Sequence, residues 1–355
     1  MTSIPATVVI GSAGRRLYLI DWFRQAFDTL EIDGRVVVTE NDKTSSSATY
    51  GDIGRIMPKF SDPAYETALL DLIADLEPQL FISVNDYELH HLHVNTDLAD
   101  RMRQLGVLVP GVSAEWQRGC VDKLRMAQML TAIGVRTAPT VTGGDGAGLS
   151  ALAAYTDDVV VKHRFGSGSS GLAIVSAARA EEAVAESLLS APAQSGGEPT
   201  ADDVVVQPKL SGTEHGVDIV GALHAPGDLA AVLARRKLRM RAGETDKAVT
   251  VDPAPFVANS ALIAEAAGLT GLIDVDMFLD GEGHSTVIDI NPRFGGGYPF
   301  VHLAGADVPL YYLAQAMGRD DGFEWGRYEP GVVSAKYESI RVAGRVPVTP
   351  TSSVE

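Results

Sequence analysis

The chain has 355 residues, of which 45% are hydrophobic and 21% charged, a composition typical of globular proteins with substantial cores. Its formal net charge is -17, because Asp and Glu outnumber Lys and Arg by 46 to 29. Such an acidic chain repels phosphate backbones, so we do not expect nucleic acid as a partner unless a local basic patch overrides the charge.

One cysteine, Cys120, excludes an intramolecular disulfide and a cysteine-based metal cluster, and it favours a reducing, cytoplasmic location. The N-terminus lacks a basic segment followed by a long apolar run, so no signal peptide is expected. An apolar run of about 18 residues, the minimum for a membrane helix, does not occur in the chain. A membrane association is therefore not predicted.

The first third of the chain alternates buried strands with amphipathic helices. Strands are predicted at 6–11, 34–42 and 80–86, with helices at about 17–27 and 62–79 between them. This alternation predicts a doubly wound parallel sheet over about residues 5–112.

The pattern changes after residue 113 to helices interspersed with hairpin-like strand pairs. Helices are expected at 113–135, 178–191, 256–269 and 309–318, and strands at 157–163, 172–177, 203–210, 216–223, 229–240, 273–280 and 285–293. A weak strand is expected near the C-terminus, within 338–355.

The segment 287–300, VIDINPRFGGGYPF, carries polar residues at every second position of a strand. Asp289, Asn291 and Arg293 are therefore expected on one face. A carboxylate and an amide oxygen side by side suit a hard divalent cation such as Mg²⁺. The guanidinium would neutralise charge on a transferring phosphoryl group. The alternative interpretation is a half-exposed hairpin with a polar outer face.

The neighbouring predicted strand adds Asp274 and Asp276, also two residues apart, as further acidic ligands. The three glycines at 295–297 are interpreted as making room for a substrate beside this polar strip.

Residues 162–171, KHRFGSGSSG, form a glycine–serine turn between two predicted strands. Small residues let successive backbone N–H groups point into one concavity, which can hold phosphate oxygens. Lys162 ends the preceding strand, within reach of the same phosphates. The turn is not a Walker A loop, because no Gly-Lys-Ser/Thr follows it. A hairpin turn with a solvated lysine is the alternative.

A third segment, 204–218, leaves a strand through Pro208 and Gly212 before it reaches Glu214. Backbone groups of such a crossing segment can pair with an adenine edge, and the carboxylate can accept the two ribose hydroxyls. A turn with a solvated glutamate is the simpler alternative.

Two other charged segments are ambiguous. The basic run within 234–247 is interpreted as an active-site strand for an anionic substrate, or as a solvated strand. Asp86 and Glu88 follow the third strand, where an open α/β sheet usually places ligand contacts. They would recognise a substrate amine or simply begin the next helix.

The order of these features resembles the ATP-grasp superfamily, most of all its carbamoyl-phosphate-synthase and biotin-carboxylase-like branch. It runs from the Asp-Lys pair at 122–123 through the loop at 162–171 and Glu214 to Asp276 and the DINPR sequence at 289–293. The resemblance covers about residues 5–318, and DINPR preceded by VDMF is its most specific part.

The resemblance implies an α/β and α+β protein: an N-terminal doubly wound parallel sheet followed by an ATP-grasp fold of two α+β subdomains that clamp ATP. It divides the chain into a pre-ATP-grasp domain at 1–112, an ATP-grasp domain at 113–318 with a lid subdomain at about 140–207, and a C-terminal extension at 319–355.

The resemblance also implies residue roles. Arg293 would steady the phosphorylated intermediate. Asp276, Asp289 and Asn291 would bind Mg²⁺, with Mn²⁺ as the alternative cation. The implied ATP contacts are Lys123, Lys162, Gly168, Ser169, Ser170, Gln207, Lys209, Leu210 and Glu214.

The implied activity is that of an ATP-dependent ligase. It would convert a substrate carboxylate into an acyl phosphate, with release of ADP, and couple it to an amine. The partners would be small carboxylate and amine substrates, without nucleic acid or membrane, and a homodimer is left open. The substrates, the pathway and the role of the C-terminal extension do not follow from the sequence.

The chain departs from the family pattern at several positions. Pro208 stands where a glutamate is common, and Asp276 stands where relatives often have Gln or Glu, so the cation would sit slightly differently. The turn at 11–16 lacks the Gly-x-Gly-x-x-Gly spacing of a dinucleotide site. Arg15 and Arg16 in this turn are interpreted as anion contacts on the acceptor side, or as plain surface residues.

Two other functions stay open at this point. A nicotinamide-dependent oxidoreductase would bind its cofactor within residues 1–110 and would leave DINPR without a role. A regulatory protein would keep the ATP site without turnover.

Overall fold

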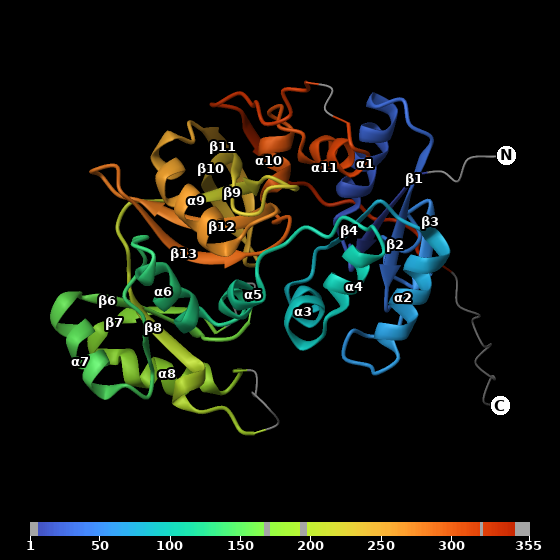
Figure 1. The fold of residues 1–355 in the computed structure, drawn as a ribbon. Coiled ribbons are helices and arrows are strands. Elements are labelled where there is room, and N and C mark those ends of the chain that lie inside the picture. Colours follow the sequence, from blue (N-terminus) through green and yellow to red (C-terminus); the bar gives the residue numbers. More distant parts are fainter. Residues whose placement is uncertain (1–5, 167–170, 192–196, 320–321, 345–355) are drawn as a thin grey trace, which may run out of the picture.

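The computed structural model describes residues 6–166, 171–191, 197–319 and 322–344. Within these residues the strands form three sheets, which Figure 1 shows as three units in space. None of the described helices is long and apolar enough to cross a membrane.

The N-terminal unit is an open four-stranded sheet in the order β3-β2-β1-β4, and all of its strand pairs are parallel. The predicted doubly wound parallel sheet is therefore confirmed, although the short strand β3 was not predicted. The elements are β1 (Ala6–Gly11), α1 (Leu17–Thr29), β2 (Gly34–Glu40), β3 (Ile53–Ile56), α2 (Tyr65–Leu76), β4 (Leu80–Ser83), α3 (Asp86–His90), a π-helical turn (His91–Asn95) and α4 (Leu98–Gln104).

A second unit is a four-stranded antiparallel sheet in the order β5-β8-β6-β7, which Figure 1 shows in green with its two helices. Its valine-rich strands bury alternate residues against α7 and α8. Its elements are β5 (Val141–Thr142), α7 (Gly146–Tyr155), β6 (Asp158–His163), β7 (Ala173–Ser176), a 3₁₀ turn (Ala177–Arg179), α8 (Ala180–Leu188), a second 3₁₀ turn (Ala201–Asp203) and β8 (Val204–Pro208).

The third unit is a six-stranded antiparallel sheet in the order β13-β12-β9-β10-β11-β14. Helices α5 (Ala114–Cys120) and α6 (Lys123–Ala132) connect the first unit to the second. The elements of the third unit are β9 (Thr213–Gly221), β10 (Leu229–Arg241), β11 (Glu244–Val251), α9 (Ala254–Ala267), β12 (Gly271–Leu279), β13 (Ser285–Asn291), α10 (Tyr298–His302), α11 (Val308–Ala316) and β14 (Val333–Ala335).

The C-terminal strand expected within 338–355 is wrong for the described residues 338–344, which form no strand. The strand lies earlier, at β14, where three residues pair with the edge of β11. Beyond β14 the chain returns to the N-terminal unit, where Arg341 donates a hydrogen bond to the Thr49 carbonyl (3.2 Å) and lies over the Tyr50 ring at 4.7 Å. Residues 345–355 lie outside the described part.

One hydrophobic core joins the first and third units. It combines side chains of β1, β2 and α1 with side chains of α10, α11, β9 and β12. Helix α11 lies beside α1 in Figure 1, and the two helices are in contact. The shared core fixes the carboxyl ends of the parallel strands relative to the six-stranded sheet.

Tyr298 is a polar anchor in this core. Its side chain is fully buried, its hydroxyl accepts a hydrogen bond from the Val308 N–H (2.9 Å), and its ring packs edge-on against Phe294. The hydroxyl therefore satisfies a backbone donor at the start of α11.

We expect Tyr298→Phe to lower the free energy of unfolding by about 1–3 kcal/mol, because the buried Val308 N–H loses its acceptor. The matched control is Tyr155→Phe, since Tyr155 is 74% exposed and its change should stay within about 0.5 kcal/mol. Urea denaturation followed by circular dichroism measures both. Equal losses in the two variants would contradict this role.

Candidate active site

The strand register places charged side chains on one face of the six-stranded sheet. Gly216 of β9 lies opposite Asp276 of β12 and Arg235 of β10, and Asp218 lies opposite Asp274. Because side chains alternate along strands, these residues and those two positions away share a face. The opposite face, which carries Ile219, Val275 and Met277 among others, packs into a separate core.

Arg235 is the centre of a buried ion network on this face. Its Nη1 lies 2.5 Å from Asp218 Oδ2 and its Nη2 lies 2.6 Å from Asp274 Oδ1. The three residues are only 1%, 0% and 9% exposed. Asp274, which the sequence also offered as a metal ligand, is held by this guanidinium through Oδ1, and its role as a ligand stays a prediction.

Lys237, two residues further along β10, is the centre of a second group of ion pairs. Its Nζ lies 2.7 Å from Glu214 Oε1 and 2.7 Å from Asp276 Oδ1. Burial lowers the pKa of Lys237, but the two carboxylates outweigh burial and raise this pKa above its usual range. Burial raises the pKa of Asp276 to about 6, against the opposing effect of Lys237.

Asp289 and Asn291 reach the same face because β13 contains a bulge. Asp276 pairs with Asp289 but the next residue, Met277, pairs with Val287, so Ile288 is an extra residue. Without the bulge, residues 287 and 289 would face the same side. The predicted polar alternation begins at Asp289 and holds for Asp289 and Asn291, while Arg293 lies beyond the end of β13. The Asp276–Asp289 pair brings two carboxylates together.

The glycines that follow this strip lie against the ion network. A Cβ atom on Gly295 would meet Asp274 Oδ2 at 2.0 Å, and one on Gly297 would meet Arg235 Nε at 2.3 Å. The space beside both glycines is thus filled by Asp274 and Arg235. The expectation that these two glycines make room for a substrate is wrong, since they make room for the buried ion network.

The predicted lysines come from the second sheet and from helix α6. Lys162 of β6 is within electrostatic reach of Asp289, Asp276 and Glu214, while burial, the largest effect, lowers the pKa of Lys162. Lys123, the first residue of α6, donates from Nζ to the Gly166 carbonyl at 2.6 Å. Lys162 therefore approaches the charged face from β6, and Lys123 from the start of α6, where it contacts the segment that precedes the glycine–serine loop.

The predicted hinge side chains make contacts within the protein. Gly168, Ser169 and Ser170 lie outside the described residues. Gln207 lies in β8, and its side chain donates to Thr140 Oγ1 at 2.7 Å, whereas Lys209 pairs with Asp158 at the surface (3.2 Å).

Leu210 is half-buried in the turn between β8 and β9. The assignment of the backbone at 207–210 as a hinge stays a prediction, and the side chains of Gln207 and Lys209 contact other parts of the chain.

Arg293 links the polar strip to the N-terminal unit. Its Nη2 lies 2.7 Å from Asp86 Oδ2 of α3, in a pair whose side chains are 12% and 15% exposed. Burial lowers the pKa of Arg293, but Asp86 outweighs burial and raises this pKa. Asp86 was predicted either to recognise a substrate amine or to begin the next helix, and the structure shows that Asp86 begins α3. Its ion pair with Arg293 is a contact between units that the sequence did not indicate.

The other charged candidates are more dispersed. Arg15 is exposed, 3.6 Å from Glu244, and Arg16 donates to the Val84 carbonyl at 3.3 Å. Within the basic run, Arg235 and Lys237 are the two residues that form ion pairs in the buried network. Sequence reasoning missed this network, although the spacing of two between these residues on a predicted strand was a usable signal.

Comparisons with known proteins agree with this geometry. Residues 200–339, which contain the charged face, match the family model described as ATP-grasp in the biosynthetic pathway with Ter operon. Residues 8–109 match the model of the PylC-like N-terminal domain. The chain is an ATP-grasp protein. Its similarity to biotin carboxylases is one of fold.

Solved structures share the fold of this ATP-grasp protein. Biotin carboxylase from Campylobacter jejuni matches with a TM-score of 0.69 at 15% identity, over 93% of this chain and 74% of that one. An L-amino acid ligase from Bacillus licheniformis matches with 0.66 at 16% identity, over 94% and 79%. N5-carboxyaminoimidazole synthetase from Staphylococcus aureus matches with 0.63 at 13% identity, over 89% and 78%. No curated protein sequence matches the chain.

The donor set of the ATP-grasp protein fits Mg²⁺. On the charged face two cations, Arg235 and Lys237, stand among five carboxylates, which leaves negative charge for a divalent ion. Among the described residues no group of three or more His, Cys, Asp or Glu side chains is arranged to hold a metal ion. Mg²⁺ commonly takes one or two carboxylates and completes its shell with water and substrate phosphate. The five carboxylates are those of Glu214, Asp218, Asp274, Asp276 and Asp289.

We expect Arg235→Met in the ATP-grasp protein to lower the free energy of unfolding by about 3–5 kcal/mol, because it leaves Asp218 and Asp274 buried without their cation. Arg236→Met is the matched control, since the neighbouring Arg236 is exposed and its loss should change stability by less than about 0.5 kcal/mol. Chemical denaturation measures both. A neutral Arg235→Met would show that the network is not needed for stability.

Proposed function

We propose that the protein is an ATP-dependent ligase that activates a substrate carboxylate as an acyl phosphate and joins it to an amine. The observation that carries this proposal is the convergence of Asp276, Asp289 and Asn291 with Lys162 and Arg293 at one edge of the charged face. Oxygen ligands for Mg²⁺ and cations for phosphate meet there.

The proposed reaction has two steps. An oxygen of the substrate carboxylate attacks the γ-phosphorus of ATP, the bond between that phosphorus and the β–γ bridging oxygen breaks, and ADP leaves. The amine nitrogen then attacks the acyl carbon, phosphate leaves with the acyl oxygen, and the nitrogen loses a proton. In such transfers the protein contributes mainly positioning, charge stabilisation and exclusion of water.

The residues of this chain have distinct proposed roles. Asp276, Asp289 and Asn291 would hold Mg²⁺, which draws charge from the phosphates when bound. Lys123 and Lys162 would contact the phosphates from the side of the second sheet. The backbone at 207–210 would meet the adenine, and Glu214 the ribose hydroxyls.

Arg293 would steady the negative charge that moves onto the acyl phosphate. Its guanidinium is buried and held by Asp86, so it is oriented before a substrate arrives. The loop tip at 168–170 keeps its proposed role over the phosphates.

Release of ADP is the direct test of the reaction. The protein is incubated with Mg²⁺-ATP and pairs of amino acids or other carboxylates and amines, and ADP is measured by a coupled assay. We expect release that depends on both substrates and on Mg²⁺. Tight ATP binding without turnover for any pair would favour an ATP-binding regulatory protein instead.

Removal of one metal ligand tests the site. We expect Asp289→Ala to lower turnover about a hundredfold or more, because the metal contributes several kcal/mol of charge stabilisation. Glu282→Ala removes an exposed carboxylate from the hairpin between β12 and β13 and should leave turnover unchanged. Both variants should unfold cooperatively, and full activity in Asp289→Ala would reject the metal assignment.

The wider proposal is a cytoplasmic enzyme that forms a homodimer. The single cysteine supports the location. Dimer formation is supported by one structural neighbour, the biotin carboxylase domain of 2-oxoglutarate carboxylase from Hydrogenobacter thermophilus, which is described as a dimer. Sedimentation velocity of the purified protein distinguishes one copy from two.

A further inference from the structure

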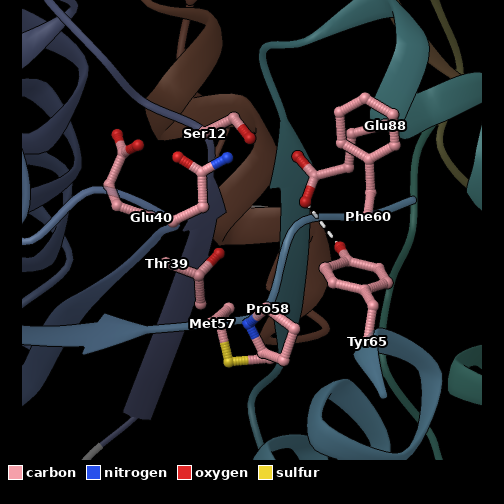
Figure 2. A pocket seen from close by; sticks show the side chains of 9 residues that line it. Ser12, Thr39, Glu40, Met57, Pro58, Phe60, Tyr65 and Glu88 are labelled. Atoms are coloured by element: carbon pink, nitrogen blue, oxygen red, sulfur yellow. Dashed lines mark hydrogen bonds between the residues drawn. The ribbon is translucent and has the colours of Figure 1, made fainter. Parts of the chain in front are cut away.

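A small cavity opens at the carboxyl edge of the parallel sheet, apart from the proposed metal ligands. It encloses about 240 Å³, its open mouth included. Figure 2 shows Ser12 and Glu40 on one side of it, and Glu88, Phe60 and Tyr65 on the other. These residues come from the ends of β1 and β2, from α3 and from the segment that leads into α2, and the proposed reaction does not use them.

Glu88 points its carboxylate into this cavity although the residue is only 2% exposed. Its two oxygens accept hydrogen bonds from the hydroxyls of Tyr65 and Ser83, each at 2.5 Å. Glu40 lines the opposite wall, and one of its oxygens, Oε1, accepts from the Gly14 N–H (2.6 Å) and the Ser47 hydroxyl, so its carboxylate is turned toward these groups rather than toward Glu88. All four hydrogen-bond donors are neutral groups.

Neither carboxylate takes part in an ion pair among the described residues, and no basic side chain lines the cavity. Burial of a carboxylate is costly unless a cation or a metal compensates its charge. Elsewhere in this protein buried carboxylates follow that rule, as Asp218 does with Arg235. The buried Glu88 is therefore oriented by hydroxyls and aimed at a space that lacks its counter-ion.

The remaining walls of the cavity indicate the kind of cation. The rings of Phe60 and Tyr65 and the thioether of Met57 line it. Aromatic faces attract organic cations, and apolar walls suit a short alkyl chain. The cavity is small and open to solvent, so it can take only a small head group and not a dinucleotide.

We propose that this cavity binds the alkylammonium group of a substrate at the carboxylate of Glu88, with Glu40 in the opposite wall. For its biological meaning this inference rests on the proposed ligase reaction, whose amine or carboxylate substrate would carry the ammonium group in addition to its reacting group. An ammonium held here as a cation is not the nucleophile, because attack requires a free electron pair on nitrogen.

The position of Glu88 connects the cavity to the proposed catalytic centre. Helix α3 has five residues, and it carries both Asp86, the partner of Arg293, and Glu88. The Asn85 side chain caps this helix by accepting from the Tyr87 and Glu88 N–H groups (2.9 and 3.2 Å). A substrate anchored by its ammonium at Glu88 would thus extend from the same helix that positions Arg293.

Binding is tested on the full chain without nucleotide, with n-propylammonium chloride as the probe. The methyl group of Met57, labelled with ¹³C and assigned with a Met57→Leu variant, reports from the wall of the cavity. We expect a saturable shift of this NMR signal with n-propylammonium, and none with 1-propanol, ribose or MgCl₂ at the same concentrations. A Met57 signal that ignores the ammonium, or that responds to the alcohol, ribose or Mg²⁺ instead, would overturn the proposal.

Variants assign the binding to the carboxylates. Glu88→Gln should weaken n-propylammonium binding about tenfold or more, because the hydrogen bond between ammonium and carboxylate loses its charge. Glu40→Gln should weaken it in the same direction and decides the question if Glu88→Gln does not fold. Asp75→Asn removes an exposed carboxylate of α2 and is the matched control. Equal affinities in all three variants would reject the site.

Because no ATP is present, failure of this titration rejects the ammonium site alone. Failure of ADP release with intact n-propylammonium binding would instead reject the ligase reaction and leave the cavity as a cation site.

Discussion

The six-stranded sheet depends on compensation of buried charge. Arg235 holds Asp218 and Asp274 in one column, and Lys237 holds Glu214 and Asp276 in the next. These contacts fix carboxylates that would otherwise repel one another in a poorly solvated region. They also leave Asp289 without a compensating cation from its own sheet. Among the described ion pairs, no Lys or Arg of the six-stranded sheet pairs with this residue of the edge strand.

The rest of the site is arranged around this network. The glycines after β13 can approach the sheet closely because they have no side chain. Asp274 and Arg235 fill the space that a side chain would need. The loop is thereby directed toward the N-terminal unit, where Arg293 meets Asp86. The shared core of α1, α10 and α11 keeps the two units in register, so the ion pair does not have to hold them together by itself.

Local sequence patterns predicted much of this fold. The parallel sheet followed from strands alternating with helices, and DINPR indicated a strand with polar residues beside an acidic neighbour. Short edge strands such as β14 were missed because three residues carry little periodic signal, and their existence depends on a partner strand far away in the sequence. The bulge at Ile288 was missed for a similar reason, since only the register with β12 reveals the extra residue.

The predicted site was recovered in part, and the gaps have physical causes. A run of five basic residues does not show which of them are buried, because burial depends on the strands on either side of β10. The Asp86–Arg293 pair joins residues that are 207 positions apart, a distance over which one sequence has no local signal. Side chains at the hinge, such as Gln207, were assigned to the ligand although Thr140 is their neighbour.

The short helix α3 couples the cavity at Glu88 to the position of Arg293. A group that settles at Glu88 and a phosphoryl group that draws Arg293 away from Asp86 both act on the same five residues. When occupation of one position shifts the helix, thermodynamics requires that each ligand change the affinity for the other by the same factor. The order in which substrates bind would then depend on the rigidity of this one capped helical turn.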